Sequence, residues 1–263
     1  MSSTADGISV AVARVAASDR LLVALDFDGT LAPLEDEPMD ARMLPAARAA
    51  VDAVVAAPDT LVALVSGRSL SDLRIIAEHG DDSPLLLAGS HGAEFWIPGE
   101  GALTHADDPG DAALRDELRA HAEQATADLA GVWIEPKRFG FGVHTRKSTP
   151  ADAAEANRLV DALVASEAPH WRRRTGHNIV EYAFRHEGKD SAIAELRERT
   201  DASAVVFAGD DITDEDALKS LGDADLGVHV GSRPTAATIC VPDIPAMADL
   251  LAVIAAERSR ARE

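Results

Sequence analysis

Four short apolar runs, each ending abruptly in polar residues, constrain the fold of this chain more than any other feature. Their side chains are apolar at consecutive positions, which is typical of strands buried on both faces inside a parallel sheet. The runs are Leu21–Leu25, Thr60–Val65, Leu85–Ala88 and Ala204–Ala208. Helical patterns alternate with them at residues 45–57, 69–79 and 190–199 and from about residue 214. This alternation of strands and helices predicts an α/β fold with a doubly wound parallel sheet.

The middle of the chain has a different pattern. A stretch punctuated by Gly and Pro follows the third run, and an alternation of helices and antiparallel strands comes after it. Helices are expected at residues 111–129 and 150–166, and strands at residues 132–135, 139–146 and 178–184. We therefore predict that residues 1–95 and 185–263 form the α/β core and that residues 96–184 form an inserted α+β domain.

The first apolar run ends in two closely spaced carboxylates, Asp26 and Asp28. Side chains alternate along a strand, so both carboxylates point to the same side. The carboxyl ends of parallel strands are also where open α/β sheets bind ligands. Two carboxylates at such a buried edge are costly unless a cation neutralises them. The pair therefore favours a metal-dependent site over the alternative, in which both residues only cap a turn.

A second acidic group follows the fourth run, in the segment Gly209-Asp-Asp-Ile-Thr-Asp-Glu-Asp216. Oxygen ligands at this density suit a hard cation. The alternative, an acidic helix N-terminus, explains Asp214 to Asp216 well because carboxylates favour that end of the helix dipole. It explains Asp210 poorly, which favours coordination of a cation.

Two further segments can supply groups that bind phosphate. Ser66-Gly67-Arg68 follows the second run, where a hydroxyl and backbone N–H groups precede a helix. Lys189 stands at the start of a helix, where a cation opposes the helix dipole, so another interaction should favour it. Taken singly, each segment has an ordinary structural explanation, a turn for the first and a surface lysine for the second.

Charge and cysteine content limit the partners and the compartment. The formal net charge of −20 argues against nucleic acid and against an anionic membrane surface as partners. Positive charge for a phosphate must then be supplied locally. The single cysteine, Cys240, excludes an intrachain disulfide and favours a reducing compartment. The N-terminal residues resemble neither a secretory signal nor a membrane span, so a cytoplasmic protein is expected.

In this order, the segments around Asp26, Ser66, Lys189 and Asp210 resemble the four motifs of the haloacid dehalogenase (HAD) superfamily of phosphohydrolases, over residues 20–95 and 185–250. The resemblance implies that Asp26 is the nucleophile that forms an aspartyl-phosphate and that Asp28 is the general acid and base. It implies Mg²⁺ as the cofactor, and a cap formed by the inserted domain. The implied phosphate-binding residues are Ser66, Gly67 and Lys189. The implied metal ligands are Asp26, Asp28 through its backbone carbonyl, and Asp210, with Asp211 and Asp214 nearby.

Further segments resemble the trehalose-6-phosphate phosphatases within that superfamily. They are Gly89-Ser-His-Gly-Ala-Glu94, Glu135-Pro-Lys137, His144-Thr-Arg146 and Gly176-His-Asn-Ile-Val-Glu181. His177 departs from the family pattern, which usually has Lys there, and a Pro usually found after the following Glu is absent. The resemblance implies that the substrate-binding residues are Arg68, His91, Glu94, Glu135, Lys137, Arg146, His177 and Glu181.

The expected function is hydrolysis of trehalose 6-phosphate to trehalose and phosphate, a step of trehalose biosynthesis, with a small-molecule sugar phosphate as the partner. One alternative is a phosphatase for another sugar or pseudo-sugar phosphate, such as a mannosyl- or glucosyl-glycerate phosphate or an aminocyclitol phosphate. A second is a non-catalytic regulatory partner of a sugar-phosphate synthase. Asp26, Asp28, Lys189 and Asp210 argue against the second alternative, because a binding module needs neither a nucleophile nor an acid and base. The sequence leaves the oligomeric state open, and a monomer is expected.

Overall fold

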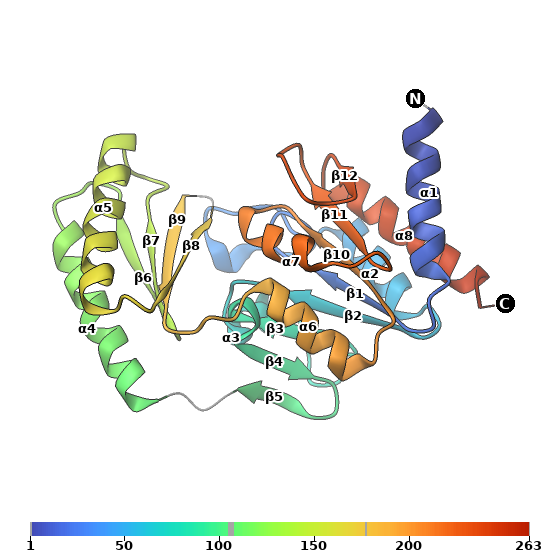
Figure 1. Ribbon diagram of the computed structural model, residues 1–263, viewed down its shortest axis with the longest axis horizontal. Helices are drawn as coiled ribbons and strands as arrows, with labels where there is room; N and C mark the ends of the chain where they lie inside the picture. Colours follow the sequence, from blue (N-terminus) through green and yellow to red (C-terminus); the bar gives the residue numbers. More distant parts are fainter. Residues whose placement is uncertain (1, 105–107, 177, 263) are drawn as a thin grey trace. The chain divides into compact units, whose positions relative to one another are not determined.

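The computed structural model describes residues 2–104, 108–176 and 178–262. These residues form two compact units (Figure 1). The first unit contains the described residues up to 104 and from 187 onward, and the second contains those between 105 and 186. The inserted domain was predicted from the sequence at residues 96–184. The role of this domain as a cap stays a prediction.

The first unit is built on one sheet with the strand order β12-β11-β10-β1-β2-β3-β4-β5. The strands from β12 to β3 pair in parallel, and β4 and β5 are added antiparallel at one edge. The α/β fold predicted from the apolar runs is therefore confirmed. The bounds are β1 (Leu21–Leu25), β2 (Thr60–Val65), β3 (Leu86–Gly89), β4 (Glu94–Ile97), β5 (Gly101–Thr104), β10 (Ala204–Gly209), β11 (Leu226–Val230) and β12 (Ile239–Val241).

Helices cover both faces of this sheet, as Figure 1 shows. Alternate side chains of β1 belong to different halves of the core. Leu21, Val23 and Leu25 pack in one cluster with residues of α1, α2, α3 and α8, whereas Leu22 and Ala24 pack in the other with residues of α6 and α7. These helices are α1 (Ser2–Ala16), α2 (Pro45–Val55), α3 (Leu70–Ile76), α6 (Lys189–Thr200), α7 (Glu215–Ser220) and α8 (Ile244–Arg260). Single helical turns occur at η1 (Pro38–Asp40), η2 (Ser90–Gly92) and η3 (Ile212–Asp214). Burial on both sides explains why the strands are apolar at consecutive positions.

The antiparallel strands β4 and β5 were not predicted. The sequence around them is punctuated by Pro98, Gly99 and Gly101, a pattern that predicts a loop. In the structure Gly99 and Gly101 adopt positive φ angles of 84° and 85°, which lets the chain reverse tightly. The two strands therefore form a hairpin that extends the sheet beyond β3.

The second unit is an antiparallel sheet with the order β6-β7-β9-β8 and two helices. Its elements are α4 (Pro109–Thr126), β6 (Trp133–Lys137), β7 (Gly140–His144), α5 (Pro150–Glu167), β8 (Arg172–Gly176) and β9 (Ile179–Ala183). Phe141, Val143 and Tyr182 are buried, and the Tyr182 hydroxyl donates a hydrogen bond of 2.7 Å to Asp161 on α5. The alternate positions face the other way. They form what we call the polar face, which carries Trp133, Glu135, Lys137, His144 and Glu181.

None of the helices among the described residues is long and apolar enough to cross a membrane.

A buried arginine near the C-terminus fixes the starts of β1 and β2. Arg258 on α8 is fully buried. Its guanidinium donates to the backbone carbonyls of Ala16 (2.8 Å), Asp59 (2.9 Å), Pro58 (3.0 Å) and Asp19 (3.1 Å), and also to that of Ser18. These carbonyls belong to the two segments that lead into β1 and β2. A single buried side chain therefore ties the two segments to α8 through five backbone carbonyls.

Replacing Arg258 by Met should lower the free energy of unfolding by about 3 kcal/mol, because the hydrogen bonds from the buried guanidinium to five backbone carbonyls are lost. Arg260→Met is the matched control, since 68% of the Arg260 side chain is exposed and it pairs with Glu257 on the same helix. The control should change stability by less than about 0.5 kcal/mol. Chemical denaturation measures both, and equal effects would contradict this role of Arg258.

Candidate active site

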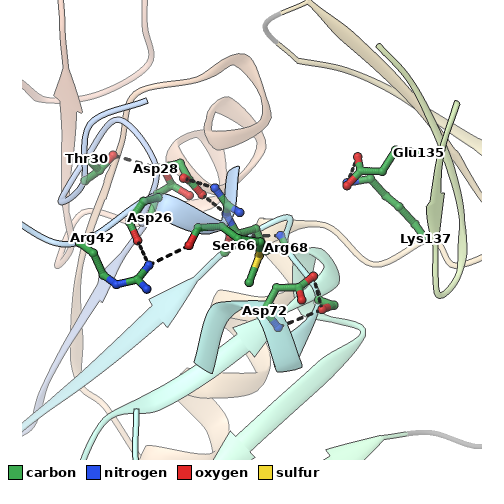
Figure 2. A network of polar contacts seen from close by, with 12 residues as sticks. Asp26, Asp28, Thr30, Arg42, Ser66, Arg68, Asp72, Glu135 and Lys137 are labelled. Atoms are coloured by element: carbon green, nitrogen blue, oxygen red, sulfur yellow. Dashed lines mark hydrogen bonds and ion pairs between the residues drawn. The ribbon is translucent and has the colours of Figure 1, made fainter. Parts of the chain in front are cut away.

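The parallel strands bring the predicted motifs together at one edge of the first unit's sheet. In the register of the sheet, Leu25 of β1 lies beside Ala208 of β10 and Leu64 of β2. The residues that follow these strands, which include Asp26, Ser66 and Asp210, therefore meet at the same edge. Figure 2 shows part of this arrangement, with Asp26, Asp28, Thr30, Ser66 and Arg68 labelled.

Three carboxylates converge at this edge. One carboxylate oxygen each of Asp26, Asp210 and Asp214 lies within 4.8 Å of the others. Asp26 is 5% exposed and Asp214 is fully buried. Burial, together with the nearby carboxylates of Asp214 and Asp210, raises the pKa of Asp26 well above its usual range, against the opposing effect of Lys189. Burial and the neighbouring Asp214 raise the pKa of Asp210 to about 7. This cluster of hard oxygen donors fits a divalent cation such as Mg²⁺.

Lys189 supplies the positive charge of the cluster. Its ammonium group lies 2.6 Å from Asp26 Oδ1 and 2.5 Å from Asp214 Oδ1, and it is buried. Burial alone would lower the pKa of Lys189, but Asp214 and Asp26 outweigh it and raise the pKa. These contacts explain a cation at the first residue of α6, where the helix dipole disfavours it. One ammonium still faces three carboxylates, so the cluster keeps an excess of negative charge.

The loop after β10 is built closely around Asp214. Asp214 Oδ2 accepts a hydrogen bond of 2.9 Å from the Asp211 N–H, which closes the turn η3. A side chain at Gly209 would start 2.2 Å from Asp214 Cγ, so only glycine fits there. Gly29 is restricted in the same way, since an added Cβ would lie 2.2 Å from Asp210 Oδ2 and its φ is 81°. Both glycines let a backbone segment approach the carboxylates closely.

Two of the predicted metal ligands lie outside this cluster. The Asp211 carboxylate pairs with Arg233 at 3.1 Å. The Asp28 carboxylate pairs with Arg68, whose Nε and Nη2 lie 2.6 and 2.7 Å from its two oxygens. The predicted role of Asp28 in metal binding concerns its backbone carbonyl, and it stays a prediction.

The segment from Ser66 to Arg68 is held from behind by the turn that follows β3. The His91 N–H donates to the Ser66 carbonyl (2.9 Å) and the Ser90 N–H donates to the Arg68 carbonyl (2.6 Å). The His91 ring packs on Gly67, where an added Cβ would lie 2.7 Å from ring atoms. Ser66 itself is 2% exposed, and its hydroxyl accepts a hydrogen bond of 3.1 Å from the Arg68 N–H.

Glu94 belongs to the same support. It is 4% exposed, and its Oε2 accepts hydrogen bonds from the Leu70 N–H (3.1 Å) and from the Ser90 hydroxyl (2.7 Å). It thereby ties the start of α3 to a turn in which Ser90 and His91 adopt positive φ angles of 49° and 59°. His91 and Glu94 were predicted to bind substrate, and in the structure they contact the loop that carries Ser66 and Arg68. The substrate-binding role of both residues stays a prediction.

The polar face of the second unit brings three other predicted residues together. Lys137 Nζ lies 2.5 Å from Glu181 Oε1 and 3.5 Å from Glu135 Oε2. Burial would raise the pKa of Glu135, but the hydrogen bond from His144 and the charge of Lys137 outweigh it and lower that pKa. Burial would lower the pKa of Lys137, but Glu181 and Glu135 outweigh it and raise that pKa.

His144 and Trp133 also belong to this cluster, although they were not among the predicted site residues. His144 Nε2 lies 2.7 Å from Glu135 Oε2, and its ring stacks on Trp133 with centroids 4.5 Å apart. Period-two alternation along the two paired strands could have found both residues, since Trp133 pairs directly with His144. Arg146, which was predicted to bind substrate, is exposed, and its guanidinium lies 6.0 Å from the Trp133 ring centre. His177, the remaining predicted residue, lies outside the described residues.

Known proteins resemble the chain over nearly its whole length. A phosphatase of Mycobacterium marinum named trehalose-phosphate phosphatase is 30% identical over 91% of this chain and 63% of its own. A Mycobacterium tuberculosis protein described as an uncharacterized glycosyl hydrolase is 33% identical over 86% of this chain. The match covers 17% of that protein, so the chain spans less than two thirds of the curated relatives it matches.

Solved structures show the same fold. The C-terminal domain of trehalose-6-phosphate phosphatase from C. albicans superposes with a TM-score of 0.79 and 19% identity, over 95% of this chain and 96% of that one. A sugar phosphatase of HAD subclass IIB superposes with a TM-score of 0.59 and 16% identity, over 87% of this chain and 96% of that one. The chain therefore has the HAD fold.

The family model of trehalose-phosphatase matches residues 24–241, which include the carboxylate cluster, Lys189 and the polar face. On that match, the chain is a member of the trehalose-phosphatase family.

Proposed function

We propose that the chain hydrolyses trehalose 6-phosphate to trehalose and phosphate through a phosphorylated Asp26. The observation that carries the proposal is the buried cluster in which Asp26 contacts Lys189 and lies beside Asp210 and Asp214. The family and its mycobacterial relatives support the class of reaction. Phosphoryl transfer needs mainly positioning and neutralisation of charge, and this edge of the sheet offers both.

The proposed roles follow from the contacts of each group. Asp26 attacks phosphorus, and its Oδ2 accepts a hydrogen bond of 3.4 Å from Thr30 that restrains its orientation. Lys189 and Ser66 bind the oxygens of the transferring phosphoryl group, with the Gly67 backbone beside them. Asp28 protonates the leaving sugar oxygen and then takes a proton from the attacking water. Asp26, Asp210 and Asp214 would hold Mg²⁺, which neutralises phosphoryl charge when bound.

We also propose that the polar face of the second unit recognises the sugar. Its clustered carboxylates and ammonium, formed by Glu135, Lys137 and Glu181, match the hydroxyl groups of a disaccharide as hydrogen-bonding partners. The stacked rings of Trp133 and His144 add an apolar surface of the kind that sugar rings contact. The alternative substrates are other sugar or pseudo-sugar phosphates.

Asp26→Asn should abolish turnover of trehalose 6-phosphate, because an amide cannot act as the nucleophile. Phosphate release should fall at least about a thousandfold. The melting temperature should not fall, since one of three crowded carboxylates is neutralised. Asp36→Asn, an exposed loop variant, is the control and should keep full activity. Residual activity above about a thousandth of wild type in Asp26→Asn would exclude the covalent mechanism.

The stabilisation of the protein by Mg²⁺ should grow as the pH rises from 5.5 to 8. The folded-state pKa of Asp210 is about 7, above its ordinary value of 3.8, so folding without metal favours the protonated form. Stability from that group is present at low pH and is lost as the pH rises through 7. Mg²⁺ needs the ionised carboxylate, so its effect increases over the same range.

Thermal melts with Mg²⁺ and with chelator at both pH values measure this effect. Asp210→Asn should remove most of the metal response, whereas Asp223→Asn, an exposed control, should keep it. A metal-induced shift that is equal at both pH values, or that survives Asp210→Asn, would contradict the assigned ligand.

Glu181→Ala should lower kcat/KM for trehalose 6-phosphate about five- to hundredfold, because sugar hydroxyls lose an acceptor. Hydrolysis of nitrophenyl phosphate should change less than twofold, since that substrate has no sugar hydroxyls for Glu181 to bind. Glu155→Ala, which removes an ion pair with Arg158 on α5, is the control and should affect neither substrate. Equal losses with both substrates in Glu181→Ala would mean that Glu181 has a structural role.

A further inference from the structure

The carboxylate of Asp28 is held by a guanidinium. Arg68 Nε donates to Asp28 Oδ2 at 2.6 Å and Arg68 Nη2 donates to Asp28 Oδ1 at 2.7 Å (Figure 2). The exposed fractions of the two side chains are 18% and 24%, so the pair is largely shielded from water. Two parallel hydrogen bonds between charged groups are the strongest arrangement available to these side chains. Both oxygens of Asp28 are therefore engaged.

This pairing conflicts with the proposed role of Asp28 as general acid and base. To serve the leaving oxygen and then the attacking water, the carboxylate must turn an oxygen toward the phosphoryl group. In the ion pair, the edge that carries both oxygens faces Arg68 instead. The arrangement seen here is therefore a resting one, and something must take Arg68 away before Asp28 can act.

The backbone of Arg68 is fixed, so the exchange involves its side chain. The Arg68 N–H donates to the Ser66 hydroxyl and its carbonyl accepts from the Ser90 N–H. Glu94 holds the same turn and the start of α3 from behind. The backbone from which the guanidinium extends is thus fixed two positions after Ser66, the proposed phosphoryl ligand. A phosphate ester offers it the same two-oxygen geometry as a carboxylate, with more negative charge.

We infer that Arg68 exchanges partners during binding. In the free protein it pairs with Asp28, and when a phosphate ester enters it pairs with the phosphoryl oxygens and releases Asp28. Arg68 is thereby a phosphate ligand that also restrains the acid and base until substrate is present. The inference rests on the proposed function for the role of Asp28, and it adds that binding and activation are coupled through one side chain.

A double-mutant cycle on phosphate binding tests the exchange. The dissociation constant of inorganic phosphate is measured by calorimetry with saturating Mg²⁺ in wild type, Asp28→Asn, Arg68→Met and the double variant. Asp28→Asn should tighten binding about tenfold, because Arg68 no longer has to leave an ion pair. Arg68→Met should weaken binding at least about tenfold. In the Arg68→Met background, Asp28→Asn should change binding less than about threefold.

The cycle removes the main competing explanation. Asp28→Asn also deletes a negative charge near the anion, but that effect persists without Arg68, so the difference between the two backgrounds reports the ion pair alone.

Arg42→Met controls for the loss of a positive charge. Arg42 donates to the carbonyls of Met39 (2.9 Å) and Ala41 (2.7 Å), and its replacement should change phosphate binding less than twofold. If Arg68→Met does not fold, Arg68→Lys serves as a second variant. It keeps the positive charge but not the paired N–H donors of the guanidinium, and it should weaken binding severalfold.

Equal effects of Asp28→Asn in both backgrounds would overturn the inference, as would a change below twofold in Arg68→Met or a wild-type protein that does not bind phosphate. Phosphate release from trehalose 6-phosphate separates this failure from failure of the proposed function. Hydrolysis of trehalose 6-phosphate with additive effects in the cycle would leave the function standing and reject the exchange. Strong coupling without such hydrolysis would support the exchange for another phosphate ester.

Discussion

The contact between Lys189 and the buried carboxylates of Asp26 and Asp214 is the interaction on which the site depends. Burying a carboxylate is costly, and burying several together is costlier still, unless opposite charge lies within contact distance. Lys189 supplies that charge at 2.6 and 2.5 Å. It does not balance the cluster, because Asp210 lies within the same group. Burial, together with the neighbouring Asp214, raises the pKa of Asp210 to about 7, and the remaining negative charge explains why a divalent cation suits this place.

The rest of the first unit holds this cluster in position. Strand β1 lies between β10 and β2, and its register places Asp26 beside the loop that carries Asp210 and beside the segment that starts at Ser66. Arg258 anchors the starts of β1 and β2 from the far end of the strands. The turn from Ser90 to Glu94 supports the segment around Gly67 from behind. Each support acts on backbone atoms, so the positions of the charged groups follow from the sheet itself.

Much of this arrangement could be predicted from the sequence. Apolar runs identify β1, β2, β3 and β10, because burial on both faces leaves no room for polar side chains. Their convergence at one edge then follows from parallel pairing, which is why Asp26, Asp210 and Ser66 could be grouped without a structure. The hairpin β4–β5 could not be predicted in the same way, since the glycines that allow it also occur in loops. The pairing of Asp28 with Arg68 is equally inaccessible, because it depends on side-chain directions at positions forty residues apart.

The central claim is that Asp26 becomes phosphorylated, and chemical trapping of that group tests it most directly. The protein is quenched during turnover of trehalose 6-phosphate and treated with borohydride, which reduces an acyl phosphate to the alcohol. Peptide mass spectrometry should then find homoserine in place of Asp26, and Lys189→Met should greatly reduce it. Phosphate release at the normal rate with an unmodified Asp26 peptide would contradict the account.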